Sequence, residues 1–158
     1  MIDLILTLKL IHILGAAVLF GTGLGIAFFM LMAHRSRDPA TIAATARMVV
    51  IADALFTVSA VVVQPVSGAA LARMLGFSLW EPWLAIALGL YVLVGLCWLP
   101  VVWIQLRLRD VAADAAKRGV ELPGSYFRLF RIWFWLGWPA FAGVIAIFAL
   151  MVWKPLSW

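Results

Sequence analysis

Hydrophobic residues run through this chain in four long stretches, and the charged residues gather in the short segments between them. The stretches cover residues 4–33, 46–72, 82–106 and 132–153. Each is at or above the roughly 20 residues that an α-helix needs to cross about 30 Å of hydrocarbon. The pattern therefore predicts an all-α integral membrane protein, with one four-helix transmembrane domain spanning residues 1–158.

Polar residues follow the third stretch at helical spacing. Asp114 and Arg118 are four residues apart, so their side chains share one face of a helix. Gly119 is a natural helix C-cap, and Pro123 cannot continue a helix. We expect a cytoplasmic extension of the third helix to residue 118.

Composition excludes an ordinary soluble domain. Of the 158 residues, 66% are hydrophobic and 12% are charged, whereas soluble domains carry about a quarter charged residues. The first stretch is too long for a cleavable signal peptide, and Asp3 stands where a basic segment would precede one. The pI of about 10.2 does not indicate a nucleic-acid partner, because the basic residues lie at helix ends. The lipid bilayer is the expected partner.

Basic residues also predict the orientation, since cytoplasmic loops of membrane proteins are enriched in Lys and Arg. The first and third connections hold most of them, so we expect both connections to be cytoplasmic and both termini to be outside. Tryptophans mark membrane interfaces, and we expect four at the outer interface and two at the inner one. The basic residues are Arg35, Arg37 and Arg47 around the first connection, and Arg107, Arg109, Lys117, Arg118, Arg128 and Arg131 around the third. The outer tryptophans are Trp80, Trp83, Trp153 and Trp158, and the inner ones are Trp103 and Trp133.

Small residues recur in the first stretch. The segment GTGLG resembles part of a dinucleotide-binding loop, but that motif requires a soluble βαβ unit around it. Ala17, Gly21 and Gly25 are spaced four apart, which predicts a groove for close helix packing in the membrane.

Polar side chains at membrane depth are costly and are candidates for function. His12 is expected roughly 12 Å below the outer end of the first helix, with Lys9 on the same face and Gln64 of the second helix near its depth. Met151 belongs to this layer, and Arg73 lies at the outer rim. These residues suit a flat apolar ligand with His12 as ligating group. The alternative is that His12 bonds Gln64 and only links helices.

The inner half holds a second polar set. His34 is expected at the cytoplasmic interface. A carboxylate inside a span needs a partner, so we expect Asp53 to form an ion pair with Arg47, His34 or Arg131.

Four segments resemble known membrane families. KLIHILGAAVLFGTGL is similar to the first helix of the HemJ-type membrane protoporphyrinogen oxidases, which carries Lys-x-x-His. SGAALA, EPWLAIALGLY and RIWFWLGWPAFAGVIAIFALMVWKP resemble the end of the second helix, the start of the third and the last helix of that family. The chain resembles still more closely a bacterial predicted integral membrane family of unknown function.

The resemblance implies a multi-pass protein of the bacterial cytoplasmic (inner) membrane that binds haem b, with His12 as axial iron ligand and Lys9 beside it. The chain differs from the oxidases at Ala85, where they have Lys, and in the residues before Pro139. It therefore implies haem binding more directly than oxidase activity.

Two hypotheses follow. One is a haem-binding redox protein, either a small cytochrome or an oxidoreductase acting on a tetrapyrrole or quinone. Its sixth ligand would be Met151, Lys9, water or His12 of a second chain in a homo-oligomer, since His34 is roughly 33 Å away along the helix. The other is a non-redox assembly subunit or small transporter, in which His12 only joins helices.

Overall fold

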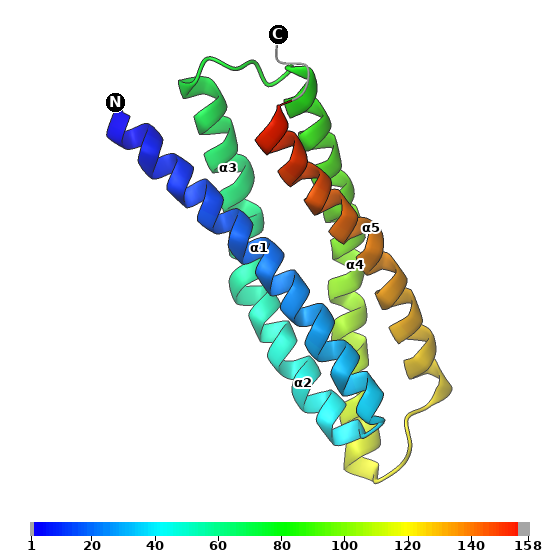
Figure 1. Ribbon diagram of the computed structural model, residues 1–158. Coiled ribbons are helices and arrows are strands. Elements are labelled where there is room, and N and C mark those ends of the chain that lie inside the picture. The colour runs from blue at the N-terminus through cyan, green and yellow to red at the C-terminus, as the bar shows by residue number, and fades with distance from the viewer. Residues whose placement is uncertain (1, 155–158) are drawn as a thin grey trace.

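The structure, a computed structural model, describes residues 2–154, and this part of the chain is entirely helical apart from its connections. Its elements are α1 (Ile2–Ser36), α2 (Pro39–Ala52), the π-helical turn η1 (Asp53–Thr57), α3 (Val58–Met74), α4 (Pro82–Arg118) and α5 (Gly124–Trp153). α2, η1 and α3 form one continuous span, so four helical spans are long and apolar enough to cross a membrane (Figure 1). The expected four-helix membrane bundle is confirmed.

Two spans begin earlier than the hydrophobic pattern suggested. The second span begins at Pro39 rather than near residue 46, because the Asp38 carboxylate accepts hydrogen bonds from the backbone N–H groups of Ala40 and Thr41 at 3.3 and 2.8 Å. Proline at the first helical position favours this start as well. α5 begins at Gly124, directly after Pro123, rather than near residue 132. In both cases the helix begins several residues before the apolar run, and hydropathy does not predict such a start.

The four spans pack in a fixed order. α1 lies against α2, η1 and α3, α4 lies against α2, and α5 packs mainly on α4. α1 and α5 meet only sparsely, although they run along the same face of the bundle (Figure 1). The two ends of the described chain lie at the same end of the bundle, as an even number of spans requires.

The interior is packed unevenly along the bundle. A large buried cluster joins α1, α2, α4 and α5 at the end that holds the α1–α2 and α4–α5 connections; its members include Met30, Ile42, Leu108 and Tyr126. At the opposite end, the buried cluster of α3 and α4 consists of Ala72, Trp83 and Leu84, with Phe77 and Met151 packed against it. The larger buried cluster therefore lies at the end with the α1–α2 and α4–α5 connections.

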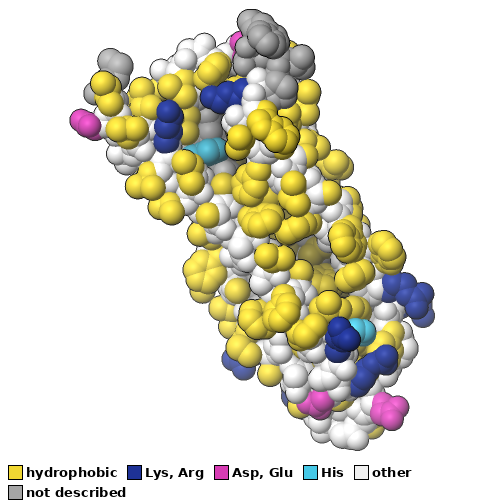
Figure 2. Space-filling view, viewed as in Figure 1, with side chains coloured by type: hydrophobic (Ala, Val, Ile, Leu, Met, Phe, Trp, Pro, Cys, Tyr) yellow, Lys and Arg dark blue, Asp and Glu magenta, His cyan; other side chains and the backbone are white. Residues whose placement is uncertain are grey.

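The outer surface fits a bilayer. On the face shown in Figure 2, hydrophobic side chains cover the middle, and Lys and Arg gather toward both ends. Trp80 and Trp153 are 87% and 78% exposed, as interfacial anchors would be. Trp83 and Trp133 are instead buried, so both pack inside the bundle. Trp158 lies outside the described residues.

Candidate functional site

His12 is joined to the second span by a side-chain hydrogen bond. Its Nδ1 lies 2.8 Å from Oγ of Ser67 on α3. Ser67 is buried, and its hydroxyl also lies 2.6 Å from the carbonyl oxygen of Val63, one turn earlier. A serine hydroxyl has one proton to donate. When Val63 receives it, Ser67 accepts from His12, so the imidazole proton is on Nδ1 and Nε2 keeps its lone pair.

The backbone of His12 is held by Gln64. The Gln64 side-chain Nε2 donates to the His12 carbonyl oxygen at 2.9 Å. The expectation that Gln64 lies at the depth of His12 is therefore met, although the contact is to the backbone and the imidazole bonds Ser67. Gln64 and Ser67 together fix both the ring and the main chain of His12 against α3.

Two glycines let α1 and α3 approach at this point. A Cβ atom on Gly15 would lie 2.5 Å from Gln64 Nε2, and one on Gly68 would lie 3.2 Å from Cε1 of His12. The groove expected at Ala17, Gly21 and Gly25 is wrong, because Cβ atoms at both of these glycines would meet nothing within 4 Å. The four-residue period identified small residues but not the face that packs.

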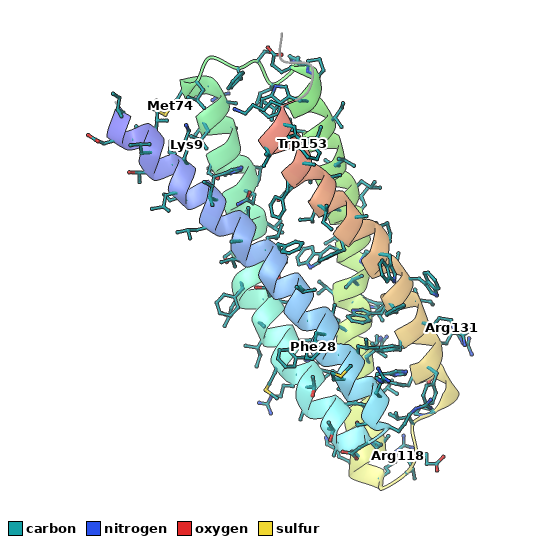
Figure 3. All side chains as sticks on the ribbon, in the orientation of Figure 1. Lys9, Phe28, Met74, Arg118, Arg131 and Trp153 are labelled. Atoms are coloured by element: carbon teal, nitrogen blue, oxygen red, sulfur yellow. The ribbon has the colours of Figure 1, made fainter. Side chains whose placement is uncertain are left out.

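The other expected ligand-binding residues lie at the same end of the bundle. Lys9 and Arg73 are both exposed, and Figure 3 shows Lys9 toward the end that carries Met74 and Trp153. Met151 packs in the cluster that contains Ala72, one helical turn beyond Gly68. Sequence reasoning did not include Lys154 in the site, and its ammonium lies 5.1 and 5.7 Å from the ring centroids of Phe77 and Trp83.

His34 belongs to an aromatic cluster at the opposite end. Its ring stacks on Phe130 with centroids 3.6 Å apart and an interplanar angle of 4°, and its Nδ1 lies 3.3 Å from the Tyr126 hydroxyl. These contacts give His34 a packing role between α1 and α5. Since 22 residues separate it from His12, roughly 33 Å of helix, the two histidines cannot share one ligand.

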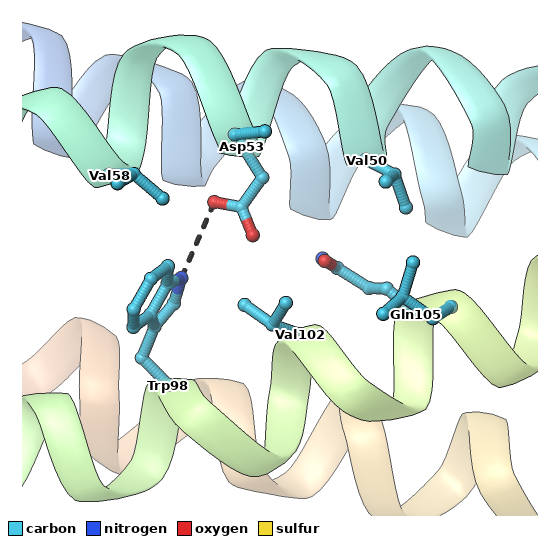
Figure 4. A pocket seen from close by; sticks show the side chains of 8 residues that line it. Val50, Asp53, Val58, Trp98, Val102 and Gln105 are labelled. Carbon is cyan, nitrogen blue, oxygen red and sulfur yellow. Dashed lines mark hydrogen bonds between the residues drawn. The ribbon is translucent and has the colours of Figure 1, made fainter.

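Asp53 has a different partner from the expected ion pair. Its Oδ1 accepts a hydrogen bond from the Trp98 indole N–H at 3.3 Å, and no ion pair of Asp53 occurs within residues 2–154. In Figure 4, Asp53 on η1 and Trp98 and Gln105 on α4 point into the same space. Asp53 and Gln105 are 4% and 1% exposed. The expectation of Arg47, His34 or Arg131 as partner is wrong because the Asp53 side chain reaches α4, whose side chains around it, Trp98 and Gln105, are neutral.

These polar residues lie between two hollows. The smaller, about 230 Å³, is lined by Asp53, Trp98, Gln105 and aliphatic residues of α2, α3 and α4. The larger, which we call the central chamber, is about 470 Å³ and is lined by all four spans. Of its lining residues, Gln105 Oε1 and Trp133 Nε1 are buried without a hydrogen-bond partner in the described part of the chain, and Asp53 Oδ2 and the neighbouring Thr57 hydroxyl lack a well-formed hydrogen bond. Sequence reasoning missed the chamber; Gln105, an amide near the end of an apolar run, was its available signal.

Pro65 shapes the wall of the chamber. Proline has no N–H to offer the carbonyl four residues earlier, which here belongs to Val61. The Tyr91 hydroxyl of α4 donates to that carbonyl. Val61 and Tyr91 both line the chamber, so the carbonyl that Pro65 leaves without its helical donor is bonded within the chamber wall.

The fold and these buried polar groups define a multi-pass integral membrane protein with four helical spans. The chain belongs to the family described as "Predicted integral membrane protein (DUF2269)", whose profile matches residues 6–155. No curated protein and no solved structure matches this chain.

Proposed function

We propose that this protein binds haem b in the outer half of the bundle and works as a redox protein of the bacterial cytoplasmic membrane, either as a small cytochrome or as an oxidoreductase. His12 is the axial ligand of the iron. The observation that supports it is the hydrogen bond from His12 Nδ1 to Ser67, which leaves Nε2 with a free lone pair. Ligating histidines characteristically donate their other ring N–H in this way.

The donor set fits haem better than a free metal ion. Among the described residues, no group of three or more His, Cys, Asp or Glu side chains is close enough to hold a metal. Haem iron needs only one or two protein ligands, because the macrocycle supplies the other four. Candidates for the second axial position remain Lys9, Met151, water and His12 of a second copy.

Positive charge at the same end suits the anionic groups of a haem. Lys9 and Arg73 are exposed there and are suited to hold propionates near the membrane surface. When bound, haem supplies one-electron chemistry, and the protein tunes it through the axial ligand and its hydrogen bonds. The electron partner in this proposal is a lipid-soluble quinone or a tetrapyrrole.

A non-redox role is the second candidate, as an assembly subunit or small transporter. The contacts of Ser67 and Gln64 with His12 favour it, because they also join α1 to α3 without any ligand. An absorption spectrum separates the two. Protein purified in detergent from haem-replete cells should show a Soret band under the haem proposal, and should stay colourless after incubation with excess haemin under the alternative.

A further inference from the structure

The central chamber combines an apolar wall with a few unsatisfied polar atoms, as a ligand site in a membrane does. We propose that it binds the ring of an uncharged, lipid-soluble quinone or quinol. This goes beyond haem binding at His12, and it assigns the quinone of the proposed function to a place in the fold. His12 does not line the chamber.

The chamber is accessible from the bilayer. It extends between α1 and α5, which contact each other sparsely. Leu24 and Phe28 of α1 and Trp138 of α5 line it and are 50%, 55% and 58% exposed. Their exposed surfaces face hydrocarbon in a membrane, so the ligand enters sideways from the lipid rather than from water.

The unsatisfied atoms specify oxygen groups on the ligand. Asp53 and Gln105 line the chamber as well as the smaller hollow, and Asp53 Oδ2 and Gln105 Oε1 lack a well-formed hydrogen bond, as does the Thr57 hydroxyl beside Asp53; Trp133 Nε1 has an N–H to donate. Leaving buried polar groups unpaired is costly, by about 1–3 kcal/mol each. The hydroxyl groups of a quinol can donate to the first two atoms, and the oxygens of either a quinol or a quinone can accept from the Trp133 N–H.

Charge excludes two other classes of ligand. No Lys or Arg is among the residues that line the chamber, so the carboxylates of a tetrapyrrole or the phosphate of a lipid head group would be buried without a counter-charge. An ammonium ion would pair with Asp53 but has no acceptor for the Trp133 N–H. The oxygens of an uncharged ring can pair with these groups without a counter-charge.

Size and shape agree with one ring. The volume of about 470 Å³ lies within the roughly 300–1,000 Å³ of small-molecule sites. Aromatic side chains of three spans supply flat walls against which a ring can stack. Phe20 of α1 and Phe141 of α5 both line the chamber and stack on each other, with ring centroids 4.9 Å apart and an interplanar angle of 26°.

Glycines provide a test that leaves the packing intact. Gly23 of α1 and Gly95 of α4 line the chamber, whereas Gly21 and Gly89 on the same helices do not. A Cβ atom at any of the four meets nothing within 4 Å, and replacing a helical glycine favours the helix. Gly23→Leu and Gly95→Leu should therefore fill the chamber, with Gly21→Leu and Gly89→Leu as matched controls.

The experiment is a titration of each purified variant with decylubiquinone, followed by quenching of tryptophan fluorescence, since Trp98, Trp133 and Trp138 line the chamber. Quenching should saturate in wild type, and Gly23→Leu and Gly95→Leu should raise the half-saturating concentration at least about tenfold. In a parallel titration with decylubiquinol, whose hydroxyl can donate to Gln105 Oε1, Gln105→Met should raise the half-saturating concentration about threefold to tenfold. Both control variants should match wild type.

Two results would overturn quinone binding. One is equal half-saturation in the chamber and control variants. The other is equal competition by decylbenzene, which has the ring and tail but no oxygens and would identify an acyl-chain groove. Haem binding at His12 is tested separately by the Soret band. Saturable quinone binding by a colourless protein would overturn only the haem proposal, and a haem protein without saturable quenching would overturn only the chamber proposal.

Discussion

Nδ1 of His12 and Oγ of Ser67 are 2.8 Å apart across the α1–α3 interface, and with the Ser67 proton given to Val63 this contact leaves Nε2 of His12 free. Replacement of His12 by Ala should therefore remove haem from the purified protein. The bundle should stay folded, because the large buried cluster lies at the opposite end. His34→Ala is the matched control and should keep nearly all of the haem. The pyridine haemochrome spectrum measures the amount of haem per protein. If His12→Ala binds as much haem as wild type, His12 only links helices.

Removing the Ser67 hydroxyl should weaken haem binding without abolishing it. Ser67→Ala leaves His12 Nδ1 without its partner, and loss of a group that orients a ligating histidine typically lowers affinity about 10- to 100-fold. Ser59→Ala is the control, because Ser59 is exposed and bonds only backbone carbonyls of its own span, those of Leu55 and Phe56. Titration of each apoprotein variant with haemin measures the two affinities. Equal affinities would show that Ser67 does not orient the ligand.

Loss of the indole N–H of Trp98 should destabilise the bundle. Trp98→Phe removes the donor to Oδ1 of the buried Asp53, which should lower the free energy of unfolding by about 1–3 kcal/mol. Trp103→Phe serves as comparison, since Trp103 is 53% exposed and such surface changes stay within about 0.5 kcal/mol. Denaturation in mixed micelles compares the two, and any haem spectrum should be the same in both.

Acid should weaken the start of α2. The Thr41 hydroxyl and backbone N–H groups that bond the Asp38 carboxylate lower the pKa of Asp38. The ionised cap therefore stabilises the fold at neutral pH, and this contribution is lost as the pH falls through the lowered pKa. Asn also caps helices but does not titrate. As the pH falls from about 5 to 3, the melting temperature of wild type should drop more than that of Asp38→Asn. A constant difference would contradict the assignment.

Orientation is open to a direct experiment. Basic residues gather around the connections at residues 37–38 and 119–123, which predicts that these face the cytoplasm. Alkaline phosphatase, which is active only outside the cytoplasm, should therefore be active when fused after Trp158 and inactive when inserted at Gly119. The reverse pattern would place His12 in the inner half of the membrane.

Hydropathy was sufficient for the number of spans because long apolar runs have few other solutions in a lipid. The starts at Pro39 and Gly124 were missed because capping and proline placement, rather than hydropathy, determine them. The depth of His12 and Gln64 could be counted at 1.5 Å per residue. Counting residues does not show which side of α1 packs against another helix, so the close-packing glycines were placed on the wrong side of α1.

The partner of Asp53 was unpredictable for a related reason. Charge suggested an arginine or a histidine, yet Trp98 lies 45 residues away on a span whose rotation depends on packing with α5. A chamber formed by all four spans has no local sequence signal. Only single polar residues such as Gln105, in otherwise apolar runs, hint that one exists.

The π-helical turn η1 changes the direction in which side chains point along the second span. Such a turn accommodates one residue more than a regular helix, and one residue corresponds to about 100° of rotation. The inner part of the span can thus direct Asp53 toward α4 while its outer part directs Gln64 and Ser67 toward His12. Deleting Ala54 would restore a regular helix and turn one set of polar residues away from its partners. One extra residue therefore lets a single helix present polar side chains both to His12 and to the central chamber.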